Sequence, residues 1–235
     1  LSTIEVISIT GGEPTLASGH YKLYEHIFRK KLEDNITLKI YTNLTNIPQD
    51  MLACWKKFKK VILVASIDGY KDINEYIRFP SKWSAIEKNI NKYVLEDKIE
   101  LHINTVVQIY NITKLDELLD WIISKNIFKE INLEILQEPE YLNIRVLPEK
   151  LKILVESKLT RFVSDPRLFK HNRNQIYELL LDMNSIDLSQ HLNKFFAFSS
   201  VLDRNRQQNI LNIIPELEPY RNIWIDYIKT TKKII

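Results

Sequence analysis

The chain has 235 residues, of which 45% are hydrophobic and 27% charged, an ordinary composition for a globular protein. Its 33 basic and 30 acidic residues leave a net charge of +3 and are spread along the chain, which argues against a nucleic-acid-binding surface. No apolar run approaches the length of a membrane span, and no signal peptide opens the sequence. The single cysteine, Cys54, excludes an internal disulfide, so a cytoplasmic location is the default expectation.

Five short runs rich in β-branched residues predict strands over residues 4–10, 37–42, 61–67, 100–107 and 130–136. Between them, apolar residues recur at helical spacing in three stripes: Met51, Cys54, Trp55 and Phe58; Trp83, Ile86, Ile90 and Tyr93; Leu115, Leu118, Leu119 and Ile122. Each gap is long enough for the crossover that parallel strands need. The first 136 residues therefore predict an α/β region of five βα-type units, forming a parallel sheet or a partial barrel.

The pattern changes after residue 136. A connection bounded by prolines, residues 137–148, is predicted to be extended, and only helices are predicted beyond it. Their apolar stripes are Leu151, Leu154, Val155 and Phe162, then Ile176, Leu179, Leu180 and Met183, and a last helix is expected from residue 219 to about residue 229. We therefore expect one domain over residues 1–147 and a mainly helical C-terminal extension over residues 148–235, facing a substrate or partner.

All four glycines lie within the first 69 residues. Gly11 and Gly12 follow the first predicted strand in Thr10-Gly-Gly-Glu-Pro-Thr15, and Gly69 follows the third. In a glycine-poor chain, a pair at a strand end marks backbone that turns sharply or approaches a ligand closely. An isolated Gly-Gly is more simply a tight turn, so its interpretation depends on the neighbouring side chains.

Polar groups follow successive predicted strands at their carboxyl ends, where parallel barrels bind ligands. Glu13, followed by the stiff Pro14, can accept charge-assisted hydrogen bonds from a ligand ammonium. Arg78 lies ahead of the next helix, where its guanidinium can clamp a carboxylate. The other members of this group are Thr42, Asn43, Ser66 and Asp68. A carboxylate for an ammonium and an arginine for a carboxylate together predict recognition of an amino-acid zwitterion.

Ile9-Thr-Gly-Gly-Glu-Pro-Thr-Leu16 resembles the GGEP motif that follows the second strand of radical S-adenosylmethionine (SAM) enzymes. Thr42-Asn43 and Ser66-Ile-Asp-Gly69, with Arg78 downstream, resemble the next elements of that fold. The resemblance covers residues 4–136 and implies a (βα)6 TIM-like barrel. The connection at 137–148 and the segment from 202–206 to 215–217 resemble the twitch or SPASM-like branch, many members of which modify peptides.

The resemblance implies a set of SAM-binding residues: Gly11, Gly12, Glu13, Pro14, Thr42, Asn43, Ser66, Asp68 and Arg78. Glu13 would bind the methionyl ammonium, while Ser66 and Arg78 would contact the ribose or the methionyl carboxylate. Residues 104–107 would lie beside the adenine. No catalytic residue is assigned, and the five histidines lack metal-ligand spacing, so we expect no metal ligand in the chain.

The resemblance is incomplete at the cluster. The family binds a [4Fe–4S] cluster through a CxxxCxxC loop after its first strand, and this chain has no such triplet. Cys54 lies on an apolar helical stripe and is expected to be a buried, inert thiol. Because the sequence opens inside a strand without Met, we expect an N-terminally truncated barrel that lacks its first βα unit.

The resemblance implies that the intact enzyme takes an electron from a donor and cleaves SAM reductively at the cluster. The resulting 5′-deoxyadenosyl radical would abstract hydrogen from a substrate, for which a peptide is one candidate, and this chain alone would be inactive. The alternative is a degenerate, non-catalytic SAM-binding or scaffold protein. An aldolase-like barrel would need a Schiff-base lysine or a glycine-rich phosphate loop at a strand end, and the sequence shows neither.

Overall fold

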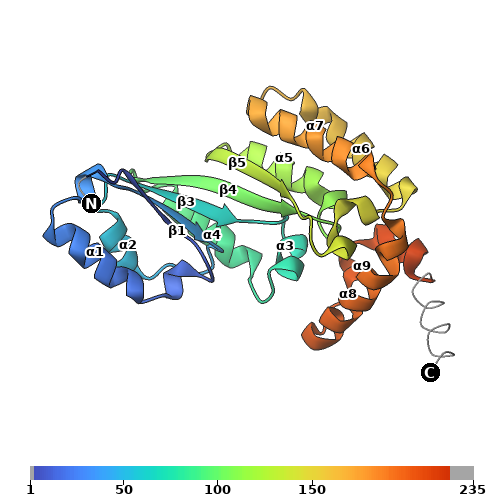
Figure 1. Ribbon diagram of the computed structural model, residues 1–235, viewed down its shortest axis with the longest axis horizontal. Helices are drawn as coiled ribbons and strands as arrows, with labels where there is room; N and C mark the ends of the chain where they lie inside the picture. The colour runs from blue at the N-terminus through green and yellow to red at the C-terminus, as the bar shows by residue number, and fades with distance from the viewer. Residues whose placement is uncertain (1–2, 223–235) are drawn as a thin grey trace. The chain divides into compact units, whose positions relative to one another are not determined.

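The computed structural model describes residues 3–222, which form an α/β protein with one five-stranded sheet. The strands are β1 (Val6–Ile9), β2 (Thr37–Thr42), β3 (Lys60–Ser66), β4 (Ile99–Val107) and β5 (Phe128–Ile135), and they lie in chain order (Figure 1). The pairings of β1 with β2, β2 with β3 and β3 with β4 are all parallel. All five predicted strands are confirmed, each end within two residues of the prediction.

Alternation along the strands gives the sheet two different faces. In β2, Leu38 and Ile40 are fully buried, whereas Lys39 and Tyr41 between them are half-buried. This period of two is that of a strand with one face against a core. The register pairs Thr42 with Ala65, so the carboxyl ends of neighbouring strands lie along one edge of the sheet.

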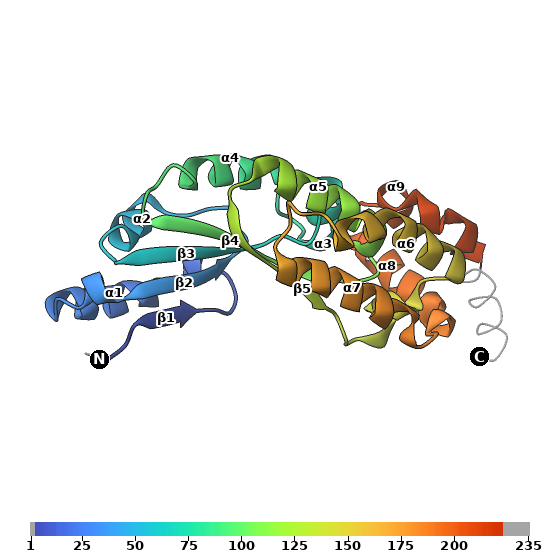
Figure 2. The same cartoon turned by 90° about the horizontal axis from the view of Figure 1, so that it is seen from above.

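Helices cover the buried face. They are α1 (Gly19–Arg29), α2 (Gln49–Trp55) and α4 (Trp83–Tyr93), and Figure 2 shows α4 running alongside the sheet. A further helix, α5, spans Leu115–Lys125. The predicted stripes of α4 and α5 are buried throughout. The α2 stripe needs two corrections: the helix ends before Phe58, and Cys54 is half-buried rather than buried, because it lies beside the buried stripe of Met51 and Trp55.

The chain divides into two compact units. Among the described residues, unit 1 comprises 3–67, 79–105 and 124–132, and contains β1 to β3, most of β4 and β5, and helices α1, α2 and α4. Unit 2 comprises residues 68–78, 106–123 and 133–222. It contains α3 (Asp72–Ile77), most of α5, α6 (Glu149–Val163), α7 (Lys170–Ser185), α8 (Leu192–Arg206) and α9 (Ile210–Ile213).

Short 3-10 turns complete the described fold: η1 (Pro14–Leu16), η2 (Glu33–Asn35), η3 (Ile112–Lys114), η4 (Glu140–Leu142), η5 (Ile144–Val146), η6 (Ser189–His191) and η7 (Pro215–Tyr220). The connection at 137–148 is therefore not extended throughout, since η4 and η5 lie within it.

The region after Pro148 contains helices and no strand as far as residue 222, and α6 packs against α7. The start of the expected last helix is the 3-10 turn η7, and residues 223–229 of that prediction lie outside the described residues. No helix in the described part of the chain is long and apolar enough to cross a membrane. The expected boundary near residue 147 stays a prediction.

Candidate functional site

In unit 1, the Glu13 carboxylate joins the turn after β1 to the end of β2. Its Oε1 accepts hydrogen bonds from the Thr15 amide (3.2 Å), the Thr15 hydroxyl (2.8 Å) and the Thr42 hydroxyl (2.8 Å). Its Oε2 accepts one from the backbone N–H of Asn43 (2.8 Å). Glu13 is also the N-cap of η1, whose first residue is the buried Pro14. The structure thus brings together the predicted residues that follow the first two strands.

The glycine pair sets the direction of that turn. Gly11 and Gly12 have φ of +87° and +49°, a region that side chains with a Cβ rarely adopt. An added Cβ would meet no heavy atom within 4 Å at either position. Glycine is therefore favoured here by the backbone conformation and not by a lack of space for a side chain.

The negative charge of Glu13 has no cationic partner among residues 3–222. All four of its hydrogen bonds come from uncharged amides and hydroxyls. A carboxylate offers about four lone-pair sites in all, and here Oε1 receives three donors while Oε2 receives one. Oε2 can therefore accept a further donor, and a cationic one would also balance the charge.

Thr42 and Asn43 both hold the Glu13 carboxylate, Thr42 through its side chain and Asn43 through its backbone. The buried Thr42 hydroxyl donates to Glu13 and accepts from the Leu44 amide at 3.1 Å. The side-chain Oδ1 of Asn43 accepts from the amide and hydroxyl of Thr45, at 2.9 and 2.6 Å. Asn43 contacts Glu13 through its backbone and not its side chain, a distinction that sequence reasoning did not make.

Ser66 is the last residue of β3 and pairs in register with Asn104 of β4. Asn104 in turn accepts a hydrogen bond from the side-chain amide of Asn132 at 2.7 Å. As the last residue of β3, the half-buried Ser66 lies at the carboxyl-terminal edge of the sheet.

In unit 2, Asp68 joins three segments of chain. Its amide donates to the Asn74 side chain (2.9 Å), and its carbonyl accepts from Asn111 Nδ2 (2.7 Å). Its Oδ1 accepts from the Val106 amide (2.9 Å), and its Oδ2 faces Arg78 Nε at 2.8 Å. Since Asp68 is only 3% exposed, these contacts give it a role in holding the chain together.

Arg78 follows the last turn of α3, and its side chain is 25% exposed. Its Nε–H is close to Asp68 Oδ2 but not aimed at it, so the contact is an ion pair and not a directed hydrogen bond. Within the described residues, the terminal nitrogens Nη1 and Nη2 have no acceptor. They are the atoms that a planar guanidinium uses to clamp a carboxylate.

Gly69 is required for a different reason from Gly11 and Gly12. A Cβ at Gly69 would lie 2.2 Å from Cγ2 and 2.7 Å from Cβ of Ile73. The backbone after β3 therefore passes so close to the first turn of α3 that only glycine fits. This close approach brings Asp68 next to Asn74.

A row of charged side chains crosses the half-exposed face of the sheet in unit 1. His102 Nε2 lies 2.6 Å from Glu100 Oε1, and its Nδ1 lies 2.9 Å from Glu130 Oε2. Lys60 pairs with Glu100 at 2.5 Å. Burial raises the pKa of the Glu100 carboxyl, but hydrogen bonds from His102 and Lys60 outweigh it and leave that pKa below its ordinary value. Sequence reasoning missed this row, because it joins three strands at alternate residues.

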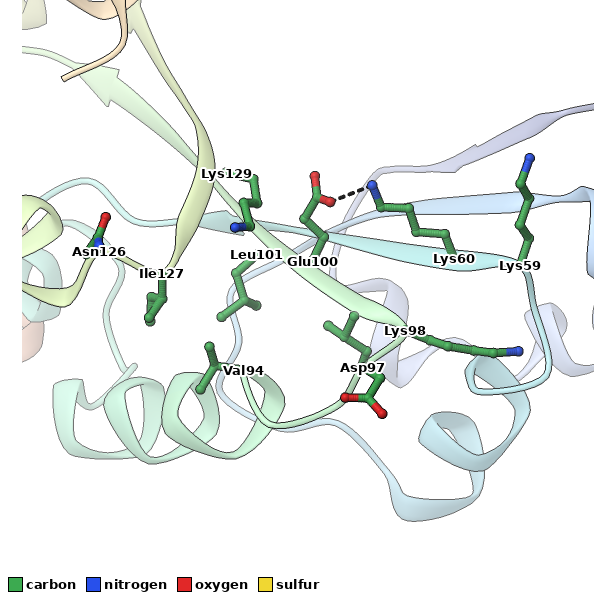
Figure 3. Close-up of a pocket in the computed structure, with 11 residues that line it drawn as sticks. Lys59, Lys60, Val94, Asp97, Lys98, Glu100, Leu101, Asn126, Ile127 and Lys129 are labelled. Carbon is green, nitrogen blue, oxygen red and sulfur yellow. Dashed lines mark ion pairs between the residues drawn. The ribbon is translucent and has the colours of Figure 1, made fainter. Parts of the chain in front are cut away.

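A hollow of about 580 Å³ lies at the amino-terminal ends of β3, β4 and β5, the opposite edge from Glu13 (Figure 3). Its lining includes Lys59, Lys60, Lys98 and Lys129. Figure 3 shows their ammonium groups pointing in different directions; Lys60 pairs with Glu100 and Lys98 donates to the Phe58 carbonyl. Because these charges do not converge, we assign no ligand to this hollow.

The sequence matches no family model and no curated protein. Its α/β architecture, however, is similar to that of solved structures. The structure of native anSMEcpe with bound AdoMet and Cp18Cys peptide matches with a TM-score of 0.51 and 17% identity, over 68% of this chain and 47% of that chain. Native anSMEcpe with bound AdoMet gives 0.50 and 20%, over 67% and 45%. Streptococcus suis SuiB bound to S-adenosylmethionine gives 0.44 and 20%, over 66% and 35%. The chain thus spans less than half the length of anSMEcpe.

The radical SAM family, which the sequence resembles, binds an iron–sulfur cluster, and the residues of this chain do not fit one. Such clusters are held by several thiolates, and the sequence has one cysteine. Burial raises the pKa of the Cys54 thiol, which disfavours the thiolate that a ligand must be. Among the residues that the structure describes, no group of three histidine, cysteine or acidic side chains is placed to hold a metal ion.

Proposed function

We propose that this chain is the SAM-binding part of a radical SAM enzyme, built as a partial (βα)6 barrel of the GGEP-containing, twitch or SPASM-like branch. The observation that carries the proposal is Glu13: a carboxylate at the carboxyl ends of parallel strands, held by four uncharged donors and paired with no cation in the described chain. Ligands of parallel α/β folds bind at this edge. The likeness in fold to anSMEcpe, whose structure contains AdoMet, supports the choice of ligand.

In this proposal, Oε2 of Glu13 accepts a hydrogen bond from the methionyl ammonium of SAM. Thr42 and Asn43 keep the carboxylate in place through the bonds described above. The terminal nitrogens of Arg78 pair with the methionyl carboxylate, while Asp68 holds the Nε side of the same guanidinium. The remaining proposed contacts are Gly11, Gly12, Pro14 and Ser66.

In an enzyme of this class, the cluster supplies the electron that starts the reaction. The single thiol of this chain cannot hold it, so we propose that its ligands come from residues outside these 235 and that the chain alone is inactive. The AdoMet complex of anSMEcpe also contains a peptide, which supports a peptide as the substrate of the intact protein.

Calorimetric titration of the full chain with SAM tests the pocket. Glu13→Gln and Arg78→Gln should each weaken SAM binding by ~10- to 100-fold, the value of a hydrogen bond to a charged group. Glu25→Gln, the same change at an exposed carboxylate of α1, and Arg29→Gln, at an exposed arginine of α1, should bind SAM like the wild type. Equal affinities for the Glu13 and Glu25 variants would refute the assignment.

The lone cysteine also favours a second candidate, a SAM-binding or scaffold protein that has lost its cluster. Both candidates predict SAM binding, so the titration does not separate them. The coding sequence upstream of Leu1 does. A CxxxCxxC motif about one βα unit upstream would support the enzyme, whereas a start codon at Leu1 would support the non-catalytic protein.

A further inference from the structure

Within unit 2, α8 holds Tyr76 of α3 at two points. The Tyr76 hydroxyl donates a hydrogen bond to Asp203 Oδ1 at 2.9 Å, and the Tyr76 carbonyl accepts one from Arg206 Nη1 at 3.0 Å. Asp203 and Arg206 are three residues apart and so share one side of the helix. Tyr76 is 1% exposed, so water does not compete freely for these bonds.

Arg206 donates to a backbone carbonyl in the last turn of α3. The last carbonyls of a helix have no partner within the helix, and the Tyr76 carbonyl is one of them. A guanidinium there satisfies an unpaired acceptor and opposes the negative end of the helix dipole. The Arg78 amide, which donates to the Asn74 carbonyl at 2.9 Å, makes the final backbone bond of the same turn.

The residues that hold Tyr76 are themselves fixed. Asp203 Oδ2 accepts a hydrogen bond from the amide of Ile210, the first residue of α9, at 3.1 Å. The ring of Tyr76 packs against Tyr110 with centroids 5.3 Å apart. The hydroxyl of Tyr110 bonds to Ser199, one turn earlier in α8, at 2.7 Å. Two successive turns of α8 therefore support the end of α3.

We propose that Asp203 and Arg206 are positioning residues for Arg78. They fix Tyr76 and with it the last turn of α3, from which the Arg78 side chain leaves two residues later. Asp68 holds the Nε side of the guanidinium, so its terminal nitrogens are presented to a carboxylate. This inference rests on the proposed function, and it makes the helical C-terminal region a determinant of ligand affinity that need not touch the ligand.

The first test compares two ligands on the full chain. Arg206→Gln and Tyr76→Phe should each weaken SAM binding on the order of 3- to 10-fold. The loss is smaller than for Arg78→Gln because the hydrogen bonds from Arg78 to the ligand carboxylate are weakened and not removed. Binding of decarboxylated SAM, which keeps the ammonium but lacks the carboxylate, should not change. Arg204→Gln, at an exposed arginine of the same helix, is the matched control and should behave like the wild type. Equal losses for both ligands, or no loss for either, would overturn the inference.

A double-mutant cycle adds a further requirement. If Arg206 acts through Arg78, then adding Arg206→Gln to Arg78→Gln should cost little further SAM affinity. Fully additive losses would show that the two arginines act independently and would contradict the proposal.

The second test does not need SAM. Hydrogen exchange at the amides of α3 and Arg78 should be faster in Arg206→Gln than in the wild type or Arg204→Gln. Exchange equal in all three would show that α8 does not hold α3, which overturns the inference. If the wild-type chain fails to bind SAM, the proposed function fails, and the exchange rates still decide whether α8 positions Arg78.

Discussion

The Arg78 guanidinium lies against the buried Asp68 carboxylate, with Nε 2.8 Å from Oδ2. The other carboxylate oxygen accepts from the Val106 amide, and the Asp68 backbone is bonded at both its N–H and its C=O. Because Asp68 is only 3% exposed, a ligand has little access to its carboxylate. Its contribution to binding is therefore best understood as orienting Arg78.

Asp68→Asn should lower the free energy of unfolding by about 1–3 kcal/mol, because it removes the charge opposite Arg78 and places an amide against a backbone donor. Asp72→Asn, at an exposed position in the first turn of α3, should lower the free energy of unfolding by less than about 0.5 kcal/mol. Urea unfolding of the three proteins measures both values. A small effect at Asp68 would mean that its contacts contribute little to stability.

Gly69→Ala should destabilise the protein by about 1–3 kcal/mol, because the new methyl would overlap Ile73. Gly19→Ala introduces the same methyl at the start of α1 with no heavy atom within 4 Å, and should be neutral or slightly stabilising. Thermal unfolding compares the two. In the double variant Gly69→Ala/Ile73→Ala the clashing side chain is shortened, so its loss of unfolding free energy should be smaller than the sum of the two single losses.

Gly12→Ala should cost about 1–2 kcal/mol through backbone strain alone, since its φ is +49° and nothing crowds the position. Gly12→Asn should cost less, because asparagine enters the left-handed region more readily. Chemical denaturation of both variants checks the order. Similar costs would point to a steric cause that the structure does not show.

Tyr24 predicts a pH dependence of stability. Burial, the largest cause, raises the pKa of its hydroxyl to about 12, despite a lowering effect of the bond from Trp55. The Tyr24 hydroxyl loses its proton at about pH 10 in the unfolded state and at about pH 12 in the folded state. The contribution of Tyr24 to the free energy of unfolding is therefore complete below pH 10 and is lost as the pH rises to 12.

Tyr24→Phe should therefore flatten the fall in unfolding free energy between pH 10 and 12. At neutral pH it should lower that free energy by about 1–3 kcal/mol, because the Trp55 indole loses its acceptor. Urea unfolding at a series of pH values gives both results. An unchanged slope would assign the alkaline sensitivity to other tyrosines.

Short-range patterns were enough to predict the sheet and the Glu13 turn. Each strand is a compact β-branched run, and the carboxyl ends of parallel strands meet at one edge, so Glu13 and Thr42 were expected together. The sequence placed Gly69 after the third strand but did not predict its close approach to Ile73. Sequence reasoning could not separate the roles of Asp68 and Arg78, because the partners of Asp68 include Val106 and Asn111, about forty residues away.

Contacts between distant segments were beyond prediction. Tyr76 and Asp203 are 127 residues apart, and nothing local marks either as a partner of the other. His102 of β4 pairs with Glu100 on its own strand and with Glu130 of β5, and the sequence around these residues does not mark the second contact. The partial exposure of Cys54 depends on the orientation of α2 about its own axis. Helical periodicity does not determine that orientation to within one residue.

The double use of the Asp203 carboxylate sets a limit for protein engineering. One oxygen holds Tyr76 and the other holds the amide of Ile210. In a shortened module that ends before Ile210, one oxygen of this carboxylate would lose its hydrogen bond. Asp203 would then be held less firmly, and so would Tyr76 in the last turn of α3. A minimal binding module made from this chain therefore needs α8 and the start of α9, although neither carries a proposed ligand contact.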